Sequence, residues 1–105
     1  MKTYKVQMSP RAKADLRNRI SYLVNVKKNP QAASSLMADF RKTRTNLETI
    51  AGSIKEPDSD ILKSRNLKRI NFREHDYFIL YRIDGDSVMI MNIFHALENF
   101  ETKLD

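Results

Sequence analysis

The last third of the sequence most narrowly constrains the fold, because it holds three strand-like runs in close succession. Residues 67–73, 77–83 and 87–94 are rich in aromatic and β-branched side chains. Asp84 and Gly85 separate the second run from the third. This pair predicts a two-residue hairpin turn, in which both positions favour positive φ. Such short connections predict a three-stranded antiparallel meander.

Two helices are predicted upstream of these strands. A Ser-Pro pair opens the range 10–28, and an Asn-Pro pair opens the range 30–51. Both pairs suit a helix start, because the first side chain can accept a free backbone N–H and proline lacks one. Apolar residues recur at spacings of three and four through both ranges. Gly52 predicts a left-handed end to the second helix, and the short connection predicts an antiparallel helical hairpin.

The remaining segments complete an α+β fold in a single domain over residues 1–105. Residues 4–8 alternate as a strand does, and residues 96–104 place Leu97, Phe100 and Leu104 at helical spacing. The predicted order is an N-terminal strand, the helical hairpin, the three-stranded antiparallel meander and a short C-terminal helix. The helical hairpin should cover one sheet face, with the first strand at an edge and the other face partly open.

Positive charge is concentrated in the predicted sheet. The sequence has 19 Lys and Arg against 13 Asp and Glu, a net charge of +6, which favours an anionic partner. Four cations lie in the strand region and are the candidate anion-binding, RNA-binding or antitoxin-binding residues: Lys68, Arg69, Arg73 and Arg82. Arginine can bind phosphate oxygens at two points. The alternative is a solvated face, or ion pairs with nearby carboxylates.

Several classes of function are disfavoured by composition. No cysteine is present, which excludes disulfides, thiolate catalysis and cysteine zinc sites. His75 and His95 stand apart without organised carboxylates, and no glycine-rich phosphate loop is present, so no metal or cofactor is expected. His75 has the character of a polar turn residue. No long apolar run is present, so we expect a cytoplasmic protein with no signal peptide and no membrane contact.

Four stretches, in this order, carry a resemblance to a known family: YKVQMSPRAKADL, NPQAA, YFILYRIDGDSVMIMNIFH and LENFETKL. Together they span nearly the whole chain. The sequence resembles the RelE/ParE superfamily of toxins from type II toxin–antitoxin systems, and within it the ParE-like and plasmid-stabilisation branch.

This resemblance implies a growth-inhibiting cytoplasmic toxin that a cognate antitoxin neutralises. Family antitoxins wrap the toxin with an extended, often acidic segment and carry the DNA-binding part. Operator DNA would therefore be contacted only through the antitoxin. ParE-like members poison DNA gyrase, whereas RelE-like members are metal-independent endoribonucleases that cut mRNA on the ribosome. Fold alone does not decide between these mechanisms.

His95 is the candidate catalytic residue of the nuclease alternative. It ends the last strand, and an unperturbed histidine can serve as acid or base near neutrality. A packing or capping role is the alternative. Nuclease-type relatives have an arginine where this sequence has Phe78, and their Arg-Arg-Asp-Tyr ending is altered here in residues 96–100. These departures favour gyrase poisoning over RNA cleavage. They also leave open a degenerate toxin that only binds its antitoxin.

Overall fold

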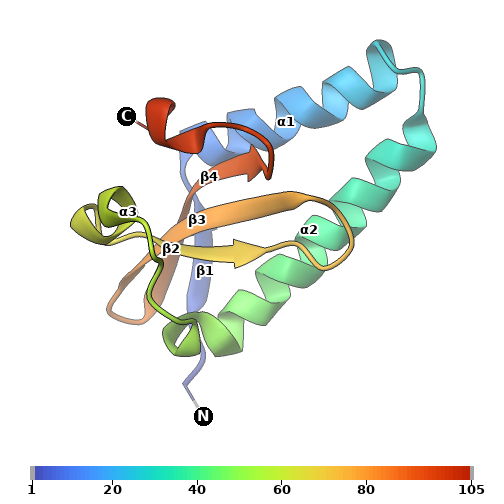
Figure 1. Ribbon diagram of the computed structural model, residues 1–105. Helices are drawn as coiled ribbons and strands as arrows, with labels where there is room; N and C mark the ends of the chain where they lie inside the picture. The colour runs from blue at the N-terminus through green and yellow to red at the C-terminus, as the bar shows by residue number, and fades with distance from the viewer. Residues whose placement is uncertain (1, 105) are drawn as a thin grey trace.

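Four strands form one mixed sheet in the order β1-β4-β3-β2 (Figure 1). The computed structural model describes residues 2–104. The strands are β1 (Lys5–Met8), β2 (Lys68–Asn71), β3 (Tyr77–Asp84) and β4 (Ser87–His95). The last three pair antiparallel, and β1 pairs parallel with β4 at the sheet edge. The predicted meander and edge strand are thus confirmed.

Three α-helices accompany the sheet: α1 (Pro10–Asn25), α2 (Pro30–Ile50) and the short α3 (Asp60–Ser64). Both long helices begin with the predicted caps, because the side chains of Ser9 and Asn29 accept backbone N–H groups at 3.0 Å. The two helices meet at a short loop and diverge from it (Figure 1). α1 is slightly shorter than predicted, and Lys28 in the loop has a φ of 52°.

Apolar side chains gather on both faces of the sheet. On the helix face, α1 and α2 pack on the sheet through the buried residues Leu16, Leu36, Phe40, Leu47, Ile79, Tyr81, Val88 and Ile90. The second face, which points away from α1 and α2, carries Leu62, Leu67, Phe78, Leu80 and Phe94, with Phe100 and Leu104 packed against them. The central strands are therefore covered on both faces, as the apolar run 87–94 predicts. The second face is less open than expected, because α3 and the C-terminal segment contribute to its core.

The β3–β4 turn is shifted by one residue from its predicted position. Asp84 pairs with Ser87, so Gly85 and Asp86 are the two central residues. Gly85 has a φ of 61°, and Asp86 is not among the residues of positive φ in the range 2–104. Positive φ is thus required at the first central position only, where glycine carries no steric penalty.

The predicted short C-terminal helix is present, but it is shorter than the predicted range 96–104. This segment contains only a short 3₁₀ turn, Phe100–Thr102, and Leu97 is 89% exposed. Local side-chain bonds compete with a helix here. The Glu98 carboxylate accepts the His95 backbone N–H at 2.9 Å, and the His95 ring accepts the Leu97 N–H at 3.1 Å.

Gly52 does not end α2 in a left-handed conformation, which corrects a second prediction. The chain continues into a 3₁₀ turn, Ala51–Ser53, and Gly85 is the glycine of positive φ. Gly52 instead lies against the hydroxyl of the buried Tyr4, which would collide with a Cβ at position 52. The glycine is needed for space rather than for backbone conformation.

Asp39 of α2 fixes the connection between β2 and β3. Its buried carboxylate accepts the backbone N–H groups of Arg73, Glu74 and His75 at 3.2, 3.0 and 2.8 Å. The His75 ring Nδ1 lies 2.7 Å from the same carboxylate. Burial acts to raise the pKa of Asp39, but these hydrogen bonds outweigh it and hold the pKa below its ordinary value.

Candidate interaction surface on the sheet

The sheet separates two of the predicted cations. Lys68 and Arg69 are neighbours in β2, and successive side chains of a strand point to opposite faces. Lys68 lies on the helix side, where its ammonium donates to the Ile54 carbonyl at 2.6 Å and ties the preceding loop to the sheet. Arg69 lies on the second face. The structure therefore does not bring these two charges together.

Arg69 packs closely against its neighbours on the second face. Its guanidinium carbon is 3.8 Å from the centre of the Phe78 ring, and its Nε donates to the Asn71 side chain at 3.0 Å. Burial lowers the pKa of Arg69. The adjacent hollow is also lined by Glu56, Asp58 and Glu101. Carboxylates therefore offset much of the positive potential around this arginine.

Arg73 lies beyond the end of β2, in the connection that Asp39 holds. Its backbone is anchored, while its side chain is exposed. Arg73 and Arg69 line one small hollow, together with Glu74, His75 and Asp76. Here too, cations and carboxylates are mixed.

Arg82 of β3 lies where positive charge is concentrated. It lines a hollow of about 320 Å³ together with Arg11 of α1 and Arg65, which follows α3. The other lining residues are Leu67, Met91, Asn92 and Leu104, and no carboxylate of residues 2–104 is among them. We call this the arginine hollow. Arg11 also pairs with Asp15 at 3.3 Å, so its charge is partly balanced from outside the hollow.

Sequence reasoning missed Arg11 and Arg65 as partners of Arg82. Arg11 lies in α1 and Arg65 in the turn after α3, so neither belongs to the strand that carries Arg82. No periodic signal links the three positions, because tertiary packing alone brings them together.

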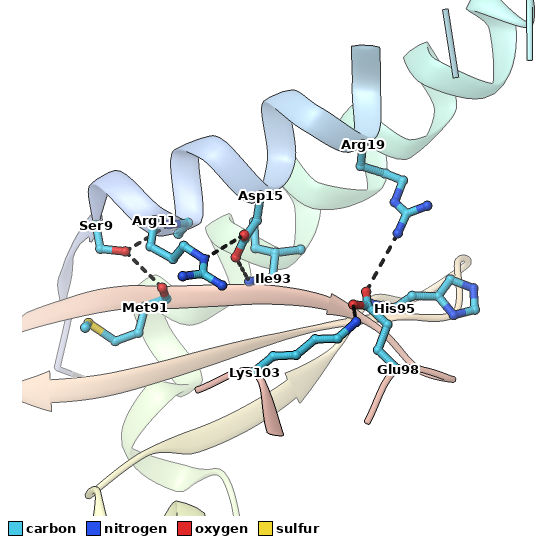
Figure 2. A network of polar contacts seen from close by, with 10 residues as sticks. Ser9, Arg11, Asp15, Arg19, Met91, Ile93, His95, Glu98 and Lys103 are labelled. Carbon is cyan, nitrogen blue, oxygen red and sulfur yellow. Dashed lines mark hydrogen bonds and ion pairs between the residues drawn. The ribbon is translucent and has the colours of Figure 1, made fainter. Parts of the chain in front are cut away.

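His95 lies at the end of β4, half-exposed, as the strand prediction requires. Its ring meets the Tyr77 ring edge-on, with 5.0 Å between ring centres. Its Nδ1 accepts the backbone N–H of Leu97. The ring points away from the polar cluster around Glu98 (Figure 2).

Glu98 joins the C-terminal segment to α1. Its carboxylate lies 3.7 Å from Arg19 and 2.8 Å from Lys103, and it accepts the His95 N–H (Figure 2). Burial acts to raise the pKa of Glu98, but the bonds from Lys103 and His95 outweigh it and lower the pKa. Sequence analysis did not identify Glu98 as a bridging residue, because its partners come from three separate segments.

Asp15 makes the second polar link between α1 and β4. It accepts the Ile93 backbone N–H at 3.0 Å near the β-bulge, where the pairing with β3 shifts after Leu80 (Figure 2). Its pKa is raised, because burial outweighs the bonds from Ile93 and Arg11. The two carboxylates that connect α1 to the end of the sheet therefore have opposite pKa shifts.

Neither metal-ligand clusters nor membrane-spanning helices occur within residues 2–104. No group of three or more His, Cys, Asp or Glu side chains in this range could hold a metal ion. No helix in the same range is long and apolar enough to span a membrane.

Comparison with solved structures shows that the fold is a known one. The chromosomal ParDE toxin–antitoxin system from P. aeruginosa matches with a TM-score of 0.73 at 17% identity, covering 89% of this chain and 96% of that chain. The toxin–antitoxin complex RelBE2 from Mycobacterium tuberculosis gives a TM-score of 0.55 at 22% identity, covering 89% and 98%. At these identities the likeness shows the fold alone, and this fold is shared with both of those chains.

The sequence itself defines the family. Residues 6–100 match the family described as the ParE toxin of the type II toxin–antitoxin system, parDE. The chain therefore belongs to the ParE toxin family, which confirms the resemblance seen in its sequence. A comparison with curated protein sequences gives no significant match.

Proposed function

We propose that this ParE-family toxin is neutralised in the cytoplasm by a cognate acidic antitoxin and inhibits growth by ParE-like poisoning of DNA gyrase. The observation that carries the choice of target is the aromatic cluster on the second face. The Phe78 ring centre lies 5.8 Å from that of Phe94 and 5.4 Å from that of Phe100. An apolar cluster therefore occupies the position where nuclease-type relatives place an arginine.

The position of Arg82 relative to His95 also supports a binding role over RNA cleavage. Metal-free cleavage needs an acid or base and phosphate-binding cations within reach of one phosphate. His95 pairs with Tyr77, whereas Arg82 pairs with Met89 near the other end of β4. At about 3.3 Å per residue, these positions are roughly 20 Å apart along the strand. His95 and the arginine hollow would not act on one phosphate together.

The test compares expression of the wild-type toxin and His95→Ala, with antitoxin supplied separately to maintain the cells. We expect growth arrest with an induced DNA-damage response, undiminished by His95→Ala, and stabilised double-strand breaks when purified toxin meets gyrase and DNA. Mapping of mRNA 5′ ends should show no cuts at ribosomal A sites. A-site cuts that disappear in His95→Ala would instead establish the RelE-like endonuclease. Absence of arrest, with antitoxin binding intact, would indicate a degenerate toxin.

A further inference from the structure

Ser35, His75 and Asp39 form a hydrogen-bonded series, and His75 also lines the hollow that Arg69 and Arg73 share. The Ser35 hydroxyl lies 3.3 Å from the His75 Nε2, and the His75 Nδ1 lies 2.7 Å from the Asp39 carboxylate. Ser35 and Asp39 are one turn apart on α2 and therefore on the same side of that helix. His75 reaches them from the connection between β2 and β3.

The surroundings of Asp39 fix the direction of these hydrogen bonds. A carboxylate only accepts, so Nδ1 carries the proton that it shares with Asp39. In the neutral ring, the lone pair of Nε2 then faces the Ser35 hydroxyl. Asp39 is held by three backbone N–H groups and its side chain has no exposed surface, whereas the His75 side chain is 27% exposed. The buried end is thus rigid, and the end at Ser35 is open to solvent.

We propose that Ser35 is an activated nucleophile, with His75 as its general base and Asp39 as the residue that positions His75. A nucleophile bonded to a base that a third group orients is the arrangement by which serine hydroxyls become reactive. The site would take small acyl or phosphonyl electrophiles that carry a good leaving group. This activity is independent of the toxin function proposed above, since it uses none of the same residues.

The reaction is a single substitution. The Ser35 Oγ forms a bond to the phosphorus of a fluorophosphonate, the phosphorus–fluorine bond breaks, and fluoride departs with its electron pair. The hydroxyl proton passes to the His75 Nε2 and then to solvent. The backbone N–H of Ser35 is engaged within α2, so it does not serve as an oxyanion donor. We therefore expect a stable adduct rather than turnover.

The first experiment treats the folded protein with a biotinylated fluorophosphonate and follows intact mass and peptide mapping. We expect one adduct per chain, located at Ser35 and absent in Ser35→Ala. Ser34 is the matched control, because it is the adjacent exposed serine on the same helix. Ser34→Ala should label at the wild-type rate. No adduct, or adducts at Ser34 as fast as at Ser35, would overturn the proposal.

A second experiment assigns the base. His75→Gln should lower the labelling rate at least about 100-fold, the usual scale of general-base assistance. Circular dichroism would verify its fold, and an unchanged rate in a folded variant would contradict the role of His75. Nitrogen-15 NMR of the wild-type ring should show the proton on Nδ1, with that preference lost in Asp39→Asn. A wild-type ring protonated on Nε2 alone would overturn the proposal even if the variants do not fold.

Discussion

At the scale of single residues, Asp39 is the side chain whose loss should cost most. Its buried carboxylate accepts three backbone N–H groups and contacts a histidine ring. Asp39→Asn keeps the shape but removes the charge and directs an amide toward donors. We expect a loss of about 3 kcal/mol in the free energy of unfolding at pH 7. Urea titration of both proteins measures this loss.

The contribution of Asp39 to the free energy of unfolding should also depend on pH. The folded pKa of Asp39 lies below the unfolded value of 3.8. As the pH falls from the unfolded pKa toward the folded pKa, the unfolded chain therefore binds more protons than the folded chain. The stability advantage of the wild type over the Asp39→Asn variant should accordingly be complete at neutral pH. That advantage should shrink as the pH falls below about 5.

For Asp15 we expect the opposite dependence of stability on pH. Its folded pKa is raised above 3.8, so the folded chain binds more protons there, and stability falls as the pH rises through the window. The stability of Asp15→Asn relative to wild type should therefore improve as the pH rises from acid to neutral. Parallel pH trends for the Asp39 and Asp15 variants would show that one of the two pKa assignments is wrong.

At the scale of elements, the turn after α2 depends on a space that one glycine leaves. Gly52→Ala should be destabilising by about 1 kcal/mol, because its Cβ would collide with the Tyr4 hydroxyl and the Tyr4 side chain would have to shift. In a Tyr4→Phe background the hydroxyl is absent, and the nearest ring atom lies 3.5 Å from a Cβ at position 52, which is an ordinary contact distance. Alanine should then be neutral or stabilising, because it loses less backbone entropy than glycine on folding.

Thermal unfolding of the wild type, both single variants and the double variant completes this cycle. If Gly52→Ala costs at least about 0.5 kcal/mol less in the Tyr4→Phe background than in the wild type, the strain lies at the Tyr4 hydroxyl. Equal costs of Gly52→Ala in the two backgrounds would show that some other contact is responsible.

The elements differ in how far sequence alone defined them. The capped helices and the alternating strands were predictable, since their signals are local. The turn at Gly85 was displaced by one residue, because strand register is fixed by which side chains are buried. The C-terminal helix was predicted too long from apolar spacing, because only the 3₁₀ turn Phe100–Thr102 forms. Leu97 is exposed there because hydrogen bonds of His95 and Glu98 shape the backbone.

The site residues also divide into those predictable from local sequence signals and those that only tertiary packing brings together. Strand alternation was enough to separate Arg69 from Ile70, but the face that Arg69 shares with Arg82 follows from the pairing register of β2 and β3. The grouping of Arg82 with Arg11 and Arg65 could not be predicted, because three separate elements supply the three side chains. The series from Ser35 to Asp39 was equally hidden. Its histidine lies in a loop whose path depends on the carboxylate that it contacts.

At the scale of the whole molecule, the arginine hollow is the part of the second face best suited to an acidic partner. We expect Arg82→Glu to weaken antitoxin binding at least about tenfold, because reversal of an interface charge replaces attraction by repulsion. Lys42→Glu is the matched control, since it makes the same charge change at an exposed position of α2. Isothermal titration with the purified antitoxin compares them.

The predicted involvement of Arg69 and Arg73 can be tested in the same titration. If the antitoxin covers the whole second face, Arg73→Glu should also weaken binding, though less, because Glu74 and Asp76 already surround it. Equal effects of Arg82→Glu and Lys42→Glu would show that net charge alone governs binding. The hollow would then have no special part in it.

The parallel pairing of β1 with β4 also determines when the sheet can form during synthesis. Lys5 pairs with Ser87, so β1 must wait for a partner strand that is synthesised much later in the chain. β4 also separates β1 from β3, and the sheet cannot close before β4 is made. The complete sheet therefore forms only after β4 has been synthesised. Until then the chain lacks the sheet face on which the candidate interaction surface lies.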